Sequence, residues 1–335
     1  MVSRCASHFV NRRRSCSPIQ VKLQRKNAAP PQKNLPSHTN ALLNQGLSVS
    51  ENKKTKSGLR VAIFQYAPVF GEKEQNIKRL FSHAENSEFD ILVLPELFAT
   101  GYQFKNRKEL ESLAEQATFK PQDSSHKPFD SEEDFTLNRL KELSKKKKAL
   151  IIAGFAEKTS DGRLFNSSAV VAPDELLGVY RKIHLFDREK ELFDSGDKPP
   201  MVYEFRNVKI GVMICFDWLF PEMARKLALS GAQIIAHCAN LVLPYCQRAM
   251  FARAVENRVF TVTVNRTGTE ERIEGERLHF TGGSIIYSPK GDVLLHLGKT
   301  EEKLSVVEIE PKEALDKRIT PRNHLFNDRR PSFYI

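Results

Sequence analysis

The sequence predicts a layered α/β fold in which buried strands alternate with helices along one large domain. Short apolar runs recur through residues 59–335, and segments with helical apolar spacing separate several of them. Hydrophobic residues make up 40% of the chain, which is enough for a sizeable core. About 277 residues follow the N-terminal 58, a length that suits a single domain. Alternating strands and helices are typical of layered α/β architectures.

Apolar runs and alternation mark the strands. We expect them at residues 60–65, 91–94, 149–154, 166–172, 209–215, 233–237, 259–265, 283–288, 292–297 and 304–309. Helical spacing predicts helices at residues 73–87, near 133–147, in a short segment closed by Gly231, and at 246–257. The lysine run Lys145 to Lys148 ends one of these helices, because positive charge favours the C-terminal end of the helix dipole. Ser288 to Asp292 form a turn between two late strands.

Cys215 ends the apolar run 209–215, which predicts a buried strand, and a short helical pattern follows it. A sharp turn from strand to helix exposes a side chain, and backbone N–H groups at a helix start favour a thiolate and a developing oxyanion. The same arrangement places the serine of unrelated hydrolases. Cys215 is therefore a candidate nucleophile, although a cysteine at a strand end is more often a small core residue.

Two further polar residues interrupt apolar segments. Glu96 follows the apolar strand 91–94 and Pro95, and a buried carboxylate is unfavourable without a partner. Lys182 lies in residues 178–186, an otherwise apolar, strand-like stretch. Taken alone, Lys182 would be interpreted as a solvated lysine at a sheet edge.

Together these residues resemble the nitrilase superfamily, the carbon–nitrogen hydrolases. The chain has Leu-Pro-Glu at 94–96, Tyr-Arg-Lys-Ile-His at 180–184 and Cys-Phe-Asp-Trp-Leu-Phe-Pro-Glu at 215–222, with Gly-Asp at 196–197 and Asn-Arg at 257–258. The resemblance runs from about Leu59 to the C-terminus and is closest to the microbial aliphatic nitrilase and amidase branch. It implies a four-layer α-β-β-α sandwich whose members pair through one helical layer, so we expect a homodimer or a higher homo-oligomer.

The resemblance also implies roles for the three residues. Cys215 would attack a carbonyl or nitrile carbon, and Glu96 would be the general base. Lys182 and the backbone N–H of Phe216 would stabilise the tetrahedral intermediate. Ammonia would leave, and water would then hydrolyse the thioester. A carboxylate beside an apolar strand end should have a raised pKa, which suits the base.

Many members of the family carry a second glutamate that orients the lysine. The matching position here is Glu189, seven residues after Lys182. Glu191 lies two residues further on and is the alternative. We prefer Glu189, because its seven-residue gap from Lys182 fits the family pattern, and the alternative is a solvated acid in a charged loop.

The predicted substrate is a small, mostly apolar or neutral amide, with a nitrile as the alternative. In relatives that bind carbamoyl amino acids an arginine commonly follows the nucleophile, and residues 216–220 contain no cation. Tyr102 and Trp218 are candidate pocket walls, although either could equally belong to the core. Asn240 lies in a stretch that resembles the family segment near the substrate amide, and we expect it to hydrogen-bond the substrate.

The formal charge of +11 belongs to the N-terminal tail. Residues 1–58 contain eleven Lys and Arg and one acid, Glu51, which accounts for +10. The rest of the chain is almost neutral, so we expect no nucleic-acid partner. The composition of the tail predicts disorder. Arg12 to Arg14 also fit a transit peptide, so a mitochondrial or plastid location is the alternative to the cytoplasm.

The five cysteines are Cys5, Cys16, Cys215, Cys238 and Cys246. Their odd number and their spacings match no disulfide framework and no zinc site, and no phosphate-binding or dinucleotide motif is present. We therefore expect no metal and no cofactor. No apolar stretch reaches the length of a membrane span, so no membrane partner is expected. Cys238 stands where related chains often have proline, which places a second thiol near the predicted site.

Other functions use the same features. A non-catalytic scaffold member of the family is disfavoured, because three buried reactive groups would have no purpose in a dead site. A nucleic-acid-associated protein would use the basic tail. An acyl or amide transferase would use the same thioester with a nucleophile other than water.

Overall fold

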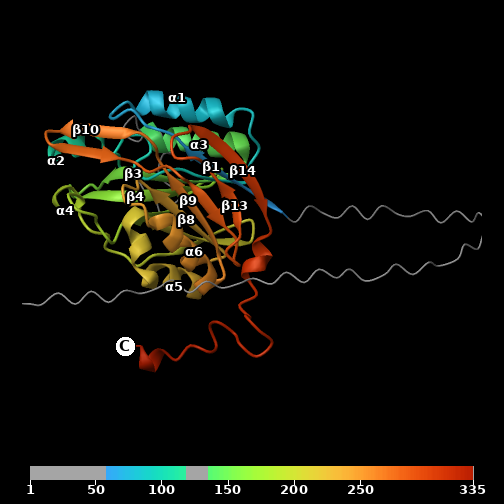
Figure 1. The fold of residues 1–335 in the computed structure, drawn as a ribbon. Coiled ribbons are helices and arrows are strands. Elements are labelled where there is room, and N and C mark those ends of the chain that lie inside the picture. Colours follow the sequence, from blue (N-terminus) through green and yellow to red (C-terminus); the bar gives the residue numbers. More distant parts are fainter. Residues whose placement is uncertain (1–57, 118–134, 335) are drawn as a thin grey trace, which may run out of the picture. The chain divides into compact units, whose positions relative to one another are not determined.

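The computed structural model describes residues 58–117 and 135–334, and within them two six-stranded sheets lie face to face (Figure 1). Helices α1 (Lys73–Ala84) and α3 (Phe135–Lys147) cover the outer face of the first sheet. Helices α5 (Pro221–Leu229) and α6 (Cys246–Asn257) cover the outer face of the second. The predicted four-layer α-β-β-α sandwich is confirmed. The predictions of a disordered tail and a transit peptide fall outside the described residues.

The first sheet has the strand order β14-β1-β2-β3-β4-β5. Its strands are β1 (Leu59–Gln65), β2 (Ile91–Val93), β3 (Leu150–Lys158), β4 (Leu164–Val171), β5 (Leu176–Arg181) and β14 (Lys303–Ile309). β2 pairs in parallel with both β1 and β3, whereas the outer pairs are antiparallel. Central parallel strands are covered on both faces, which explains why β2 is wholly apolar in sequence.

The second sheet has the strand order β13-β12-β9-β8-β7-β6. Its strands are β6 (Val202–Phe205), β7 (Val208–Ile214), β8 (Ile234–Ala239), β9 (Phe260–Asn265), β12 (Ile285–Tyr287) and β13 (Val293–His296). β7, β8 and β9 are parallel neighbours, so their C-terminal ends meet at one edge of the sheet. Cys215 and Asn240 follow the first two of these strands at that edge.

Shorter elements complete the described part of the chain. They are α2 (Arg107–Leu113), α4 (Glu189–Leu192), the hairpin β10 (Thr269–Ile273) and β11 (Glu276–His279), and 3-10 helices at Cys215–Leu219, Pro311–Ala314 and Pro331–Phe333. The sequence prediction missed the β10–β11 hairpin, because its residues are charged and half-exposed and give no apolar signal. It also ended β3 at residue 154, whereas the strand continues to Lys158. No helix among the described residues is long and apolar enough to cross a bilayer.

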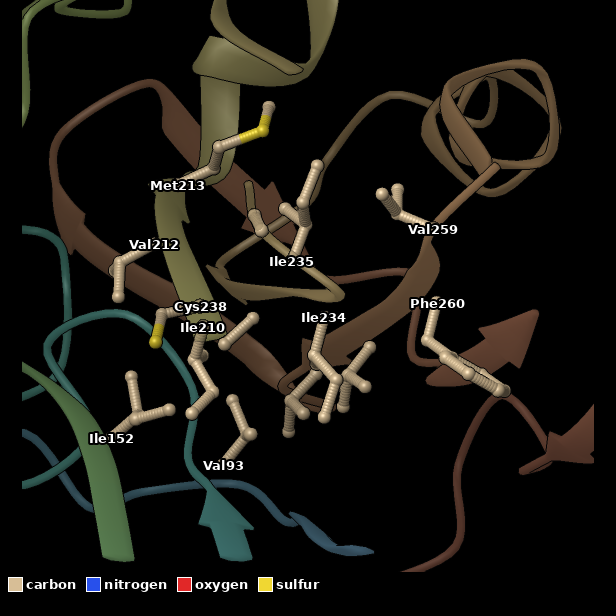
Figure 2. Close-up of a cluster of buried hydrophobic side chains, with 14 of the residues drawn as sticks. Val93, Ile152, Ile210, Val212, Met213, Ile234, Ile235, Cys238, Val259 and Phe260 are labelled. Atoms are coloured by element: carbon tan, nitrogen blue, oxygen red, sulfur yellow. The ribbon is translucent and has the colours of Figure 1, made fainter. Parts of the chain in front are cut away.

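Apolar side chains of the two sheets interdigitate between them (Figure 2). Val93 and Ile152 extend from the first sheet, and Ile210 and Ile234 extend from the second. All four are completely buried. Because such interiors are close-packed, this layer fixes the separation and angle of the sheets.

Shortening one side chain of this layer should destabilise the protein strongly. We expect Ile152→Ala to lower the free energy of unfolding by about 2–5 kcal/mol, because it removes buried methylenes and leaves a cavity. The matched change Ile319→Ala affects a side chain that is 54% exposed, and its effect should stay within about 0.5 kcal/mol. Urea unfolding of both variants measures the difference. Equal losses of unfolding free energy in the two variants would contradict the place of Ile152 in the core.

Candidate active site

A sharp turn places Cys215 at the end of β7. The strand ends at Ile214, and Cys215 begins a 3-10 helix with φ of 39°, in the left-handed region that non-glycine residues rarely occupy. Asp217 holds this turn, since its Oδ2 accepts hydrogen bonds from the Ile214 N–H at 2.9 Å and from the Tyr180 hydroxyl at 2.8 Å. His184 Nδ1 lies 2.8 Å from Asp217 Oδ1. The predicted strand–turn–helix arrangement around Cys215 is therefore present.

Glu96 lies in the turn that follows β2 and is completely buried. The turn packs directly on Gly154 of β3, where an added Cβ would lie 2.5 Å from Glu96 Cα. Two backbone hydrogen bonds join the segments, from Gly154 N–H to Pro95 O at 3.1 Å and from Phe98 N–H to Gly154 O at 3.0 Å. The absence of a side chain at residue 154 thus allows the Glu96 turn to approach the neighbouring strand.

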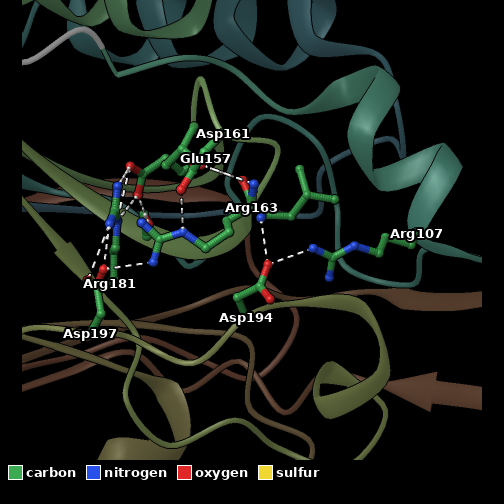
Figure 3. A network of polar contacts seen from close by, with 10 residues as sticks. Arg107, Glu157, Asp161, Arg163, Arg181, Asp194 and Asp197 are labelled. Atoms are coloured by element: carbon green, nitrogen blue, oxygen red, sulfur yellow. Dashed lines mark hydrogen bonds and ion pairs between the residues drawn. The ribbon is translucent and has the colours of Figure 1, made fainter.

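Lys182 directly follows β5, and its neighbour Arg181 anchors the end of that strand (Figure 3). Arg181 binds Glu157 of β3 with N···O distances of 2.5–3.1 Å and reaches Asp197 at 3.2 Å. The Lys182 N–H donates to Asn166 O at 2.8 Å. These contacts fix the backbone of Lys182, while its side chain is only 1% exposed.

The Lys182 ammonium lies between two buried carboxylates. Its Nζ donates to Glu96 Oε1 at 2.7 Å and to Glu189 Oε1 at 2.8 Å. Asn166 Nδ2 donates to the same Glu96 oxygen at 2.7 Å. Glu189 is 3% exposed. Glu191, the alternative considered from sequence, points outward with a side chain that is 72% exposed.

Glu189 is itself held by two further donors. The Tyr102 hydroxyl donates to Oε1 at 2.7 Å, and the Phe186 N–H donates to Oε2 at 3.0 Å. With Lys182, these donors stabilise the charged form of Glu189. The structure thus brings Tyr102 to the site as a partner of Glu189.

Burial and neighbouring charges determine how the site is protonated. Burial raises the pKa of the Cys215 thiol well above its usual value, and the charge of Glu96 raises it further. Lys182 and a hydrogen bond from the Asn240 backbone N–H act in the opposite direction. Burial alone would lower the pKa of Lys182, but attraction to Glu189 and Glu96 outweighs it and raises that pKa. Burial, followed by repulsion from Glu96, raises the pKa of Glu189 against the effect of Lys182.

Several buried polar atoms of the site have no hydrogen-bond partner among the described residues. They are Glu96 Oε2, Asn166 Oδ1, and both Oδ1 and Nδ2 of Asn240. Asn240 is 3% exposed. Buried polar groups are nearly always paired, and an unpaired one is costly, so these atoms mark a place where a polar ligand would complete the hydrogen bonding.

The other predicted substrate-binding residues lie in different surroundings. Phe216 is half-buried and packs its ring 5.1 Å from that of Phe186. Tyr102 is also half-buried and borders a small pocket beside Glu189. Aromatic and aliphatic side chains, among them Phe104, Phe186, Phe193 and Val242, line that pocket together with charged ones such as Arg188 and Glu276.

Trp218 lies in the core, the alternative that the sequence left open beside a pocket wall. It is 6% exposed, belongs to the hydrophobic core that also contains β7, and does not line the pocket beside Glu189. Its carbonyl accepts hydrogen bonds from Arg253 of α6 at 3.2–3.3 Å. The tight turn after β7 directs Trp218, the fourth residue of the 3-10 helix, inward, which the sequence pattern alone does not specify.

Sequence reasoning missed the roles of Asn166 and Asp217. Asn166 belongs to a run of three polar residues in β4 that are completely buried, and such a polar run in a buried strand was the available signal. Cys238 lies between the sheets, 3.5 Å from Ser168 Oγ, and burial raises the pKa of its thiol to about 12. Among residues 58–117 and 135–334, no group of three or more His, Cys, Asp or Glu side chains could hold a metal ion.

Comparisons with known proteins show the family and the fold of this chain. The family model of the carbon–nitrogen hydrolases matches residues 60–317. A nitrilase of Pyrococcus abyssi is 42% identical over 280 residues, which cover 83% of this chain and 99% of that protein. An (R)-stereoselective amidase of a Pseudomonas species is 32% identical over 75% of this chain and 85% of its own. The crystal structure of a carbon–nitrogen hydrolase of Helicobacter pylori superposes with a TM-score of 0.70 and 24% identity, over 83% of this chain and 97% of that one, and has the same fold.

The close approach at Gly154 predicts a specific sensitivity. Gly154→Ala would place a methyl group against the Glu96 backbone, so we expect it to lower the free energy of unfolding by about 1–3 kcal/mol. The matched control Gly298→Ala meets its nearest atom at 3.4 Å, and its effect should stay within about 0.5 kcal/mol. Urea unfolding measures both. A neutral Gly154→Ala would contradict the observed packing.

The raised pKa of Cys215 predicts how its reactivity depends on pH. Because methyl methanethiosulfonate reacts with thiolates, modification of Cys215 should be slow near neutral pH and accelerate only above the ordinary range of thiols. Glu96→Gln removes a nearby negative charge, so it should lower the pKa and shift the curve to lower pH. Peptide mass spectrometry follows the reaction. A rate that is already maximal at pH 7 in the unmodified protein would refute this expectation.

Proposed function

The chain belongs to the carbon–nitrogen hydrolase family, the nitrilase superfamily, and on that premise we propose that it cleaves a small aliphatic amide to a carboxylic acid and ammonia. Membership establishes the class of enzyme, a carbon–nitrogen hydrolase. The choice of an amide as substrate is our proposal and rests on the unpaired polar atoms around Cys215.

The type of these atoms favours an amide over a nitrile. Three are oxygen atoms, Glu96 Oε2, Asn166 Oδ1 and Asn240 Oδ1, and one is a donor, Asn240 Nδ2. A primary amide offers two N–H donors and one carbonyl acceptor, whereas a nitrile offers an acceptor alone. An amide would therefore satisfy more of the buried groups than a nitrile, and this is the observation that carries the proposal.

The geometry supports a two-step mechanism. Cys215 Sγ attacks the amide carbon while Glu96, whose Oε2 is free to accept, takes the thiol proton. The need for a base follows from the raised pKa of Cys215, which leaves the thiol protonated at rest. Lys182 and the Phe216 N–H stabilise the tetrahedral oxyanion.

The tetrahedral intermediate then collapses. The C–N bond breaks, the nitrogen receives the proton from Glu96 and leaves as ammonia, and a Cys215 thioester remains. Glu96 next takes a proton from water, which attacks the thioester. The C–S bond breaks, the proton returns to the Cys215 sulfur, and the carboxylic acid is released.

The surroundings of the site support a small acyl group. The pocket beside Glu189 is bordered by Tyr102, Phe104 and Phe186, and Cys215 itself is only 6% exposed. Apolar walls would bind an aliphatic group, while the buried polar atoms orient the amide. A nitrilase remains the second candidate, because the relative that is 42% identical is a nitrilase.

A matched substrate pair tests the proposal. We expect ammonia release from propionamide to exceed that from propionitrile by at least about tenfold, and Cys215→Ala to abolish it, because the nucleophile is lost. Cys246→Ala, a change at a second buried cysteine at the start of α6, is the control and should retain activity.

The outcomes separate the candidates. Faster release from propionitrile would favour the nitrilase. No release from either compound, with a folded protein whose Cys215 still reacts with methyl methanethiosulfonate, would refute hydrolysis of small amides and favour a transferase. An unreactive Cys215 would instead favour a non-catalytic scaffold.

A further inference from the structure

A second buried ion pair lies outside the catalytic cluster. Arg266 follows β9 and is 1% exposed, and Glu270 of β10 is 6% exposed. Arg266 Nη1 donates to Glu270 Oε1, and the guanidinium stacks 4.0 Å from the ring centre of Phe280. Burying two charges is costly even when they are paired, so stability alone does not account for this pair.

The Glu270 carboxylate holds the backbone of residues 102 and 103. It accepts the Tyr102 N–H at 3.1 Å and the Gln103 N–H at 2.6 Å, both through Oε2. Gly101 precedes them with φ of 83°, and a Cβ there would lie 2.9 Å from Glu270 Oε1. The chain is thus shaped so that its N–H groups converge on this carboxylate.

The residue held in this way reaches the catalytic cluster. The Tyr102 hydroxyl donates to Glu189 Oε1 at 2.7 Å, and the same oxygen accepts from Lys182 at 2.8 Å. The Tyr102 ring meets Phe280 edge-on at 6.0 Å, so Phe280 packs on both Arg266 and Tyr102. A continuous series of contacts therefore leads from Arg266 through Glu270, Tyr102 and Glu189 to Lys182.

We propose that Glu270 is a positioning residue for catalysis: by holding the Tyr102 backbone it keeps the phenol hydroxyl donating to Glu189, so that Glu189 stays charged and holds Lys182. This inference rests on the proposed hydrolysis of amides. Glu270 touches neither the substrate nor the reacting atoms, and it acts through Tyr102.

The proposal makes a prediction about pH. The charged and titratable groups that face Glu189 are Lys182, Glu96, Cys215 and Tyr102. A hydrogen bond to a carboxylate favours its charged form, so loss of the Tyr102 donor raises the pKa of Glu189. Because Glu189 must be charged to hold Lys182, the acidic limb of the activity profile should move to higher pH.

The test is a double-mutant cycle on the hydrolysis of propionamide between pH 5.5 and 9. We expect Glu270→Gln and Tyr102→Phe each to lower kcat about tenfold at neutral pH and to shift the acidic limb in the same direction. The double variant should lose about tenfold and not about a hundredfold, because both changes break one series of contacts. Glu271→Gln, a neighbouring exposed glutamate paired only with Arg277 among the described residues, should match the unmodified protein.

Other outcomes overturn the proposal. If the losses of kcat in the double variant multiply, Glu270 and Tyr102 act independently. If Glu270→Gln lowers kcat evenly at every pH, Glu270 acts on stability alone. If Glu270→Gln does not fold, Glu270→Asp is tested in its place. The shorter aspartate keeps the charge opposite Arg266 but withdraws the carboxylate from the Tyr102 N–H.

A measurement that does not depend on hydrolysis separates this inference from the proposed function. If the unmodified protein hydrolyses no amide, the pH profile of Cys215 modification by methyl methanethiosulfonate is compared instead. Glu270→Gln and Tyr102→Phe should then shift that profile in the same direction, while Glu271→Gln should not. A Glu270→Gln profile identical to that of the unmodified protein would overturn the positioning role even then.

Discussion

The burial of Lys182 between Glu96 and Glu189 is the interaction on which the site depends. An isolated charge at 1% exposure would cost several kcal/mol, so the ammonium requires both carboxylates. Two acids against one base leave the cluster with an excess of negative charge. That excess, added to the burial of the thiol, raises the pKa of Cys215, so the proposed attack requires a general base. The same three side chains thus explain both the electrostatics of the site and the first step of its chemistry.

The residues that surround Lys182 and Cys215 come from both sheets. In the first sheet Glu96 lies in the turn after β2, Asn166 lies in β4 and Lys182 directly follows β5, whereas Cys215 and Asn240 follow β7 and β8 in the second. The apolar layer between the sheets therefore sets the distance between nucleophile and base. The packing of a core residue such as Ile152 and the geometry around Cys215 therefore depend on the same apolar layer.

The sequence predicted the parts of this arrangement that leave a local signal. Wholly apolar parallel strands are visible as continuous runs, and a carboxylate or thiol at their ends stands out against them. The residues that contact this carboxylate and thiol were harder to predict from the sequence. Glu189 and Glu191 lie two residues apart in a four-residue helix, and only the fold directs one inward and the other to solvent. The β10–β11 hairpin and Glu270 have charged, half-exposed surroundings, so their connection to Tyr102 depends on long-range contacts that no pattern reveals. Trp218 points into the core because of the turn at Cys215.

The charge of the cluster also bears on the direction of the proposed reaction. A neutral amide approaches the site without electrostatic cost, whereas the acid product, once it has lost its proton, carries a negative charge next to Glu96 and Glu189. In a buried site of low effective dielectric that repulsion is stronger than in water, so the product is bound less well than the substrate. A site that binds its charged product weakly releases it readily after the thioester is hydrolysed. The excess negative charge that keeps Cys215 protonated at rest would therefore assist the last step of the proposed cycle.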